Sequence, residues 1–236
     1  MTPQMMTRMR RLAAALVAMS LLTTLTGCDP RTLIYFLQPY EPTIPAPGPS
    51  LKNKKVVVLS AADAATLGRF PGLERDLARQ FTNNLKKNKK ITTVETEKIA
   101  NWLEAHPDWS DPAEAARDFE ADVVIVLEVE QFQTRHPGSL NVLEGSSKVH
   151  IRAFELAHPK NSKGKPITDQ PKESEEIYDD YQETTFPIRG PIPMDSGVGE
   201  STFKNKLLQV VADECSWHFI EHSQGDIIQD VRFNGR

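Results

Sequence analysis

The chain has 236 residues, of which 39% are hydrophobic and 25% charged, and its formal net charge is −4. This length allows one sizeable hydrophobic core. Without residues 1–27, which contain three arginines and no acidic residue, 25 Lys and Arg stand against 32 Asp and Glu, a net charge of about −7. Such an acidic chain is a poor non-specific ligand for nucleic acid or anionic lipid, because both require clustered Lys and Arg.

Residues 1–27 have the three parts of a secretory signal peptide: a basic start, an apolar stretch and small residues before a cleavage point. The apolar stretch, residues 12–25, has 14 residues. A transmembrane helix needs about 20, so cleavage is favoured over an uncleaved anchor. The start codon stays open among Met1, Met5, Met6 and Met9.

The signal peptide ends in Leu25-Thr26-Gly27-Cys28, which resembles the bacterial lipobox. The resemblance implies cleavage between Gly27 and Cys28, with a diacylglyceryl group and a further acyl chain such as palmitate on Cys28. Several acyl chains give stable membrane attachment, whereas one alone is marginal. Asp29 is similar to an inner-membrane retention signal, but inner and outer membrane both stay open. We therefore expect a cell-envelope lipoprotein that faces the periplasm.

Residues 28–53 are interpreted as the lipid anchor and a proline-rich tether. A proline recurs every two or three residues over 39–49, which favours extended polyproline II geometry. The segment is predicted to be a spacer, although proline-rich segments also bind aromatic grooves.

The globular domain is expected over 54–236. It opens with a buried strand over 54–59, followed by a loop with Asp63 and an amphipathic helix over about 72–88. Four lysines crowd the end of this helix: Lys86, Lys87, Lys89 and Lys90. We interpret them as cations that complement the helix dipole; the alternative is an anion-binding patch.

Next come a strand over 91–95, a helix over 97–105 capped by Thr96, and a helix capped by Asp111 with Pro112 at its first position. Residues 121–132 contain an unbroken run of β-branched and apolar residues, which predicts a central strand covered on both faces.

The second half of the domain is predicted to hold strands over 147–156 and 173–186, a helix from Thr202 to about His222, and a short strand within 225–236. Early helices between strands imply parallel pairing and the later hairpin implies antiparallel pairing. The fold class is therefore α/β, a single domain with a mixed sheet packed by amphipathic helices. The loops over 158–172 and 187–200 are the expected contact sites for a partner.

One motif hints at metal chemistry. His218, Glu221 and His222 match H-x-x-E-H, which would place both histidines on one helical face, and Glu214 lies one turn before His218. A catalytic zinc site needs a third protein ligand and a cleft, and only 14 residues follow His222. We expect neither a bound metal nor another cofactor. Nucleotide-binding and nucleophile motifs are absent from the sequence, and Cys215 lies in a helical pattern that favours a buried thiol.

The order of these elements resembles a group of bacterial envelope lipoproteins that includes the curli secretion lipoprotein, the activator lipoprotein of penicillin-binding proteins and the amino-terminal domain of TolB. The resemblance rests on KKVVVL, LERDLARQFTNNL, ITTVE and ADVVIVLEVE, which start at residues 54, 73, 91 and 121. It implies an α/β sandwich that docks to envelope proteins rather than one that catalyses a reaction. Leu127-Glu128 stands where those families often have glycine, and long amphipathic hairpins are missing, so pore formation is not implied.

Two functional hypotheses follow. The first is a non-enzymatic, lipid-anchored envelope protein that docks to a protein partner as an accessory of an assembly or cell-wall complex. The alternative is a metal-assisted hydrolase that uses His218 and His222.

Overall fold

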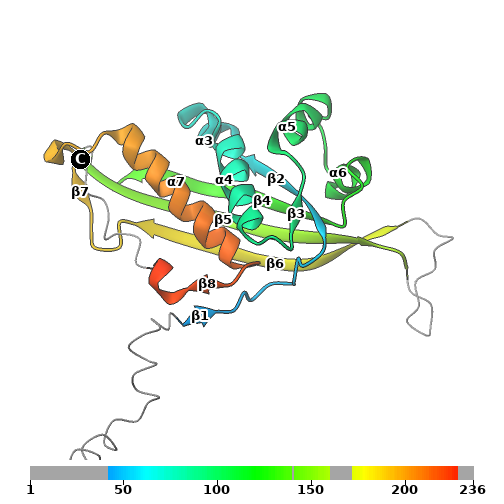
Figure 1. Ribbon diagram of the computed structural model, residues 1–236. Helices are drawn as coiled ribbons and strands as arrows, with labels where there is room; N and C mark the ends of the chain where they lie inside the picture. The colour runs from blue at the N-terminus through cyan, green and yellow to red at the C-terminus, as the bar shows by residue number, and fades with distance from the viewer. Residues whose placement is uncertain (1–41, 140, 160–171, 228–236) are drawn as a thin grey trace, which may run out of the picture. The chain divides into compact units, whose positions relative to one another are not determined.

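A computed structural model describes residues 42–139, 141–159 and 172–227. The main sheet has the strand order β3-β2-β4-β5-β6, and β7 pairs with β5 (Figure 1). The strands are β2 (Lys55–Ala62), β3 (Thr92–Thr93), β4 (Val123–Arg135), β5 (Val142–Ala157), β6 (Glu173–Phe186) and β7 (Ile192–Pro193). β2 runs parallel to β3 and β4, whereas β4, β5 and β6 form an antiparallel meander. The predicted mixed α/β sheet is confirmed.

The connections between β2 and β4 contain helices. The helices between β2 and β4 are α3 (Ala64–Arg69), α4 (Leu73–Lys87), α5 (Thr96–Ala105) and α6 (Pro112–Asp118). Asp111 caps α6 as predicted, because its Oδ1 accepts a hydrogen bond from the Ala113 N–H at 2.9 Å. Asp63 likewise caps α3, a short helix that stands where a loop is predicted. The N-cap of α5 is Glu95 rather than Thr96.

The sheet has a core on each face. On one face, α4 and α7 (Glu200–Trp217) pack their apolar side chains, including Phe81 and Leu207, against alternate residues of β2 and β4. On the other face, α5 and α6 cover the intervening residues of the same strands, around Val124 and Trp102. The central strand is therefore buried on both faces, as its apolar run predicts.

The proline-rich segment corrects one prediction. Its second half belongs to the domain, since β1 (Thr43–Ile44) pairs antiparallel with β8 (His222–Ser223). The Gly48 N–H donates to the His218 carbonyl oxygen at 2.8 Å, and Leu51 is buried. A spacer over residues 43–49 and a domain boundary at 54 are therefore wrong, because this stretch gains hydrogen bonds and apolar burial on the domain.

The last helix is shorter than predicted. It ends at Trp217, and His218 is its C-cap. The apolar pattern continues to Phe219 because the chain beyond the helix still lies against the core. The predicted strand over 91–95 keeps only two paired residues. Of the predicted final strand over 225–236, the described residues lie in the 3-10 helix η2 (Gln224–Ile227), and 228–236 lie outside the described residues.

The anchor region also falls outside the described residues, which begin at Pro42, so cleavage after Gly27 and lipidation of Cys28 stay predictions. Within the described ranges, the helices lack the combination of length and apolar character that crossing a bilayer requires.

Candidate functional site

The H-x-x-E-H residues do not form the expected pair. His218 is buried at the end of α7, whereas His222 lies in β8, where its ring stacks on Trp217 with 4.3 Å between ring centroids. The prediction that the two histidines share one helical face is therefore wrong, because the helix ends before both. Within the described part of the chain, His, Cys, Asp and Glu side chains form no group of three that is arranged to hold a metal ion.

His218 instead belongs to a hydrogen-bonded network between α7 and β6. Its Nδ1 lies 2.6 Å from the Tyr178 hydroxyl and its Nε2 lies 3.0 Å from the Gln182 Oε1. Burial lowers the pKa of His218 against the opposing charge of Asp180, so the ring is neutral at pH 7. Burial also raises the pKa of Tyr178 to about 12, with the charge of Asp180 acting in the same direction.

Glu214 continues this network. Its Oε2 accepts hydrogen bonds from the Gln182 amide at 3.0 Å and from the Thr184 hydroxyl. Burial raises the pKa of Glu214 although both hydrogen bonds lower it. Tyr178, Gln182 and Thr184 of β6 thus bond His218 and Glu214, which identifies a structural cluster that fixes α7 on β6.

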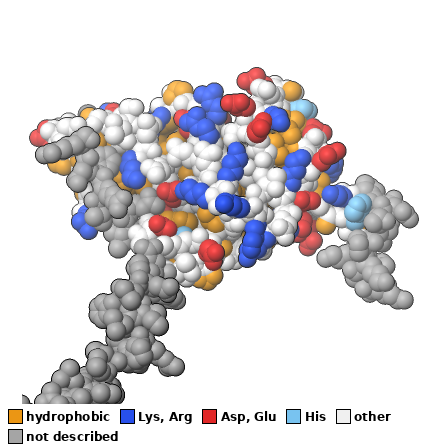
Figure 2. Space-filling view, viewed as in Figure 1, with side chains coloured by type: hydrophobic (Ala, Val, Ile, Leu, Met, Phe, Trp, Pro, Cys, Tyr) orange, Lys and Arg blue, Asp and Glu red, His pale blue; other side chains and the backbone are white. Residues whose placement is uncertain are grey.

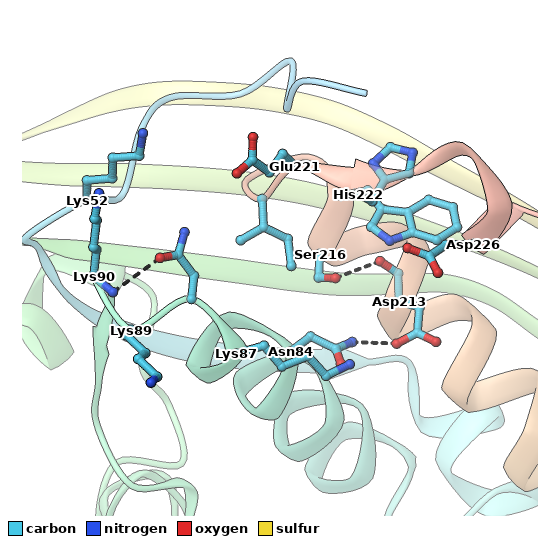
Figure 3. Close-up of a pocket in the computed structure, with 13 residues that line it drawn as sticks. Lys52, Asn84, Lys87, Lys89, Lys90, Asp213, Ser216, Glu221, His222 and Asp226 are labelled. Carbon is cyan, nitrogen blue, oxygen red and sulfur yellow. Dashed lines mark hydrogen bonds between the residues drawn. The ribbon is translucent and has the colours of Figure 1, made fainter. Parts of the chain in front are cut away.

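A hollow of about 520 Å³ opens beside this network, between the C-terminal ends of α4 and α7 (Figure 3). One wall carries the exposed Lys52, Lys87, Lys89 and Lys90, and the opposite wall carries Asp213, Trp217, Glu221, His222 and Asp226. We call it the lysine hollow. Figure 2 shows Lys and Arg side chains gathered on this face over α4.

A second feature lies at the other end of α7. The loop over 187–199 leads into this helix and exposes two large apolar side chains, Ile188 at 63% and Met194 at 36%. The loop is held in place by β7, whose Ile192 pairs with Leu143, and by the Met194 N–H, which donates to the Asn141 carbonyl at 3.0 Å. We call it the apolar loop.

An ion pair fixes the start of α7 beside the apolar loop. Arg135, at the end of β4, donates from Nε and Nη2 to the two carboxylate oxygens of Glu200 at 3.2 and 2.7 Å. Hydrogen bonds from Arg135 lower the pKa of Glu200. This bidentate pair favours one orientation of the helix start.

The uncovered part of the sheet carries paired charges. His150 stacks on Tyr181 with 4.3 Å between ring centroids and lies 2.6 Å from the Asp179 carboxylate. Lys148 pairs with Glu130 at 2.7 Å, and Arg152 pairs with Glu128. These side chains neutralise one another across strands, as expected for a solvated sheet face.

Comparisons with known proteins give no family. Neither a family model nor a curated protein matches the chain. Among solved structures, a PelC dodecamer from Paraburkholderia phytofirmans is 13% identical over 73% of this chain and 94% of that chain, with a TM-score of 0.39. Lipoprotein GNA1162 from Neisseria meningitidis is 9% identical over 58% of this chain and 83% of that chain, with a TM-score of 0.34. The LpoB C-terminal domain from Salmonella enterica is 12% identical over 59% of this chain and 87% of that chain, with a TM-score of 0.31. TM-scores this low carry no argument about function.

Sequence reasoning identified the lysines at the end of α4 and the loop over 187–200, but not their surroundings. Lys52 joins the other three lysines only through the turn before β2, and the aromatic surface combines Trp217 at the end of α7 with His222 of β8. A two-residue strand leaves no periodic signal, so the sequence could not place His222 opposite the lysines.

Proposed function

We propose that this chain is a lipid-anchored, non-enzymatic protein of the bacterial cell envelope that docks to a protein partner as an accessory of an assembly or cell-wall complex. The lipobox at residues 25–28 supports the anchor, with Cys28 as the lipidated residue and the domain facing the periplasm. The observation that carries the docking role is the exposure of Ile188 and Met194 on the apolar loop.

The apolar loop is suited to binding because it is exposed and preorganised. Large apolar side chains that remain in water gain free energy when a partner covers them. β7 fixes one part of the loop to β5, and the Arg135–Glu200 pair fixes the helix that follows. A loop that is already ordered loses less conformational entropy on binding.

A non-enzymatic role agrees with the environment of the reactive groups. Cys215 is fully buried, and burial raises the pKa of its thiol, so the nucleophilic thiolate is strongly disfavoured. His218 uses both ring nitrogens within the network on β6. The metal-assisted alternative depended on His218 and His222 sharing a helical face, and they do not.

The test is site-specific photo-cross-linking in cells. A photoreactive amino acid in place of Ile188 is expected to give one discrete cross-linked partner, whereas the same amino acid at the exposed Lys98, on α5, gives none. Met194→Asp is expected to reduce the yield about tenfold or more, because a charge then has to be buried in the contact. Mass spectrometry identifies the partner.

The anchor is tested in the same cells. Cys28→Ala is expected to abolish acyl labelling, leave unprocessed precursor and weaken the cross-link from position 188. Equal cross-linking at positions 188 and 98, or none at position 188 in a folded and lipidated protein, contradicts docking through the apolar loop. Normal processing and unchanged membrane association of Cys28→Ala contradict the anchor.

A further inference from the structure

The lysine hollow carries opposite charges on its two walls. Figure 3 shows Lys52, Lys89 and Lys90 along one side, with Glu221 and Asp226 across the opening from them. The hollow has a volume of about 520 Å³, and its walls meet where the Asn84 amide donates to Asp213 at 2.8 Å. A ligand that carries both a negative and a positive group would therefore complement both walls at once.

The described part of the domain contains lysines that form ion pairs and lysines that form none, and Lys86 and Lys204 outside the hollow belong to the second group. Lys54, Lys98 and Lys148 form ion pairs with Glu155, Glu95 and Glu130 at 2.8, 3.2 and 2.7 Å. Among the described residues, none of the four lysines of the hollow has a carboxylate within ion-pair distance. Their ammonium groups are therefore available as donors, and phosphate is an acceptor that lysine binds well.

The opposite wall is suited to a small cation. Asp226 accepts from the Ser223 N–H at 3.0 Å, which orients its carboxylate, and Glu221 is exposed. The indole of Trp217, stacked on His222, adds an aromatic surface on the same wall. Carboxylates and an indole together attract an ammonium group through charge and through the ring quadrupole.

The hollow also lies where the chain enters the domain from the anchor. Ile44 of β1 is paired with His222, which lines the hollow. Only 14 residues separate Cys28 from Thr43, and even fully extended they span no more than about 50 Å. With Cys28 in the membrane, this length limits how far the start of β1 can lie from the anchored residue.

These observations point to one ligand. We propose that the lysine hollow binds the phosphoethanolamine headgroup of a zwitterionic phospholipid in the membrane that holds the anchor. The headgroup phosphate contacts the lysine wall and its ammonium group contacts the wall of Trp217, Glu221 and Asp226. This assignment rests on the proposed anchor at Cys28, and it fits the acidic net charge of the chain, which disfavours a purely anionic surface.

The test is vesicle co-sedimentation of residues 28–236 with Cys28→Ser, so that no acyl chain contributes. Three vesicle preparations are compared: phosphatidylcholine alone, and phosphatidylcholine mixed with an equal mole fraction of either phosphatidylethanolamine or phosphatidylglycerol. We expect the tightest binding to the phosphatidylethanolamine vesicles. Soluble phosphoethanolamine is expected to compete, and inorganic phosphate at the same concentration to compete less, because it engages only the lysine wall.

Substitutions distinguish binding in the hollow from a general effect of the net charge. Lys87→Gln, Lys89→Gln and Lys90→Gln together are expected to weaken binding about tenfold, because the phosphate loses charged donors. The matched control is Lys98→Gln, Arg117→Gln and Lys204→Gln, which removes the same charge elsewhere and should leave binding unchanged. Glu221→Gln with Asp226→Asn is expected to remove the preference for phosphatidylethanolamine. Circular dichroism checks that each variant is folded.

Two results would overturn the proposal. The first is binding to phosphatidylglycerol at least as tight as to phosphatidylethanolamine, and the second is no binding to any vesicle by the folded protein. Neither result bears on lipidation of Cys28 or on the cross-link from position 188, which are measured in cells. Failure of the headgroup site is thereby distinguished from failure of the envelope role.

Discussion

The two ends of α7 present different chemistry. The N-terminal end carries the apolar loop and the exposed Arg135–Glu200 pair, whereas the C-terminal end carries the lysine hollow and the buried network of His218. The helix has 18 residues, so about 27 Å separates its ends. One helix therefore separates two surfaces: the apolar one, for which we propose a protein partner, and the charged one, for which we propose a lipid headgroup.

The same comparison separates two responses to pH. The folded pKa of Glu200 is lowered, so its contribution to stability is present above its ordinary pKa of 4.5 and is lost as the pH falls through the lower folded value. The folded pKa of His218 is also lowered, so its contribution is present above 6.5 and is lost as the pH falls below that value. Acid is therefore expected to weaken the C-terminal end first.

The largest expected effect on stability comes from a change in the core beneath the N-terminal end of α7. Phe203 is fully buried and packs on Phe186 with 5.5 Å between ring centroids. Phe203→Ala is expected to lower the free energy of unfolding by about 3–5 kcal/mol, because it leaves a cavity. Urea denaturation measures the change. The exposed Ile188→Ala is the matched control and should change stability by no more than about 0.5 kcal/mol; equal losses in the two variants would show that the apolar loop is part of the core.

The next effect concerns the C-terminal end and depends on pH. His218 is faced by Tyr178, Asp180 and Gln182 of β6, and Gln182 in turn bonds Glu214. The stability difference between wild type and His218→Gln is expected to shift in favour of the variant as the pH falls from 7 through 6.5 and below, because protonation of His218 favours the unfolded chain. Urea titrations across this range measure it, and a difference that is independent of pH would contradict the assigned cause.

Glu214 acts in the opposite direction within the same network. Its folded pKa is raised, so its contribution to stability is present below 4.5 and is lost as the pH rises through the folded value. The pH-dependent contributions of Glu214 and His222 are present in both wild type and His218→Gln, so they cancel in the stability difference between the two proteins.

The smallest effect is expected for Arg135→Ala. The Arg135–Glu200 pair is exposed to solvent, and salt screens such pairs. We expect a slight decrease in Tm at low ionic strength that disappears at high salt. A large, salt-independent decrease would show instead that the pair is required to close the N-terminal end of α7.

Residue patterns predicted the strands and helices that leave a local signal in the sequence. The apolar run of Val123–Leu127 gave the buried central strand, and Asp111 with Pro112 gave the start of α6. Both signals are local, because a strand or a capped helix is recorded within a few consecutive residues.

The short strands, the end of α7 and the lysine hollow depend on contacts between segments that are distant in the sequence. β1 and β8 have two residues each and exist only because the ends of the domain meet. Phe219 continues the apolar pattern of α7 after the helix has ended, which placed the predicted helix end too late. The lysine hollow needs Lys52 and His222 on the same surface, and that proximity is created by the fold alone.

The pairing of β1 with β8 has a mechanical consequence. Among the elements of the described residues, tension along the chain from the N-terminal side reaches β1 first. β1 is held by two residue pairs and, farther along, the chain is held by the Gly48–His218 hydrogen bond. Release of residues 43–50 would lengthen the linker by about 25–30 Å while β2 and the main sheet stayed intact. Residues 43–50 can thus act as an extension that increases the reach of the domain from the proposed anchor at Cys28.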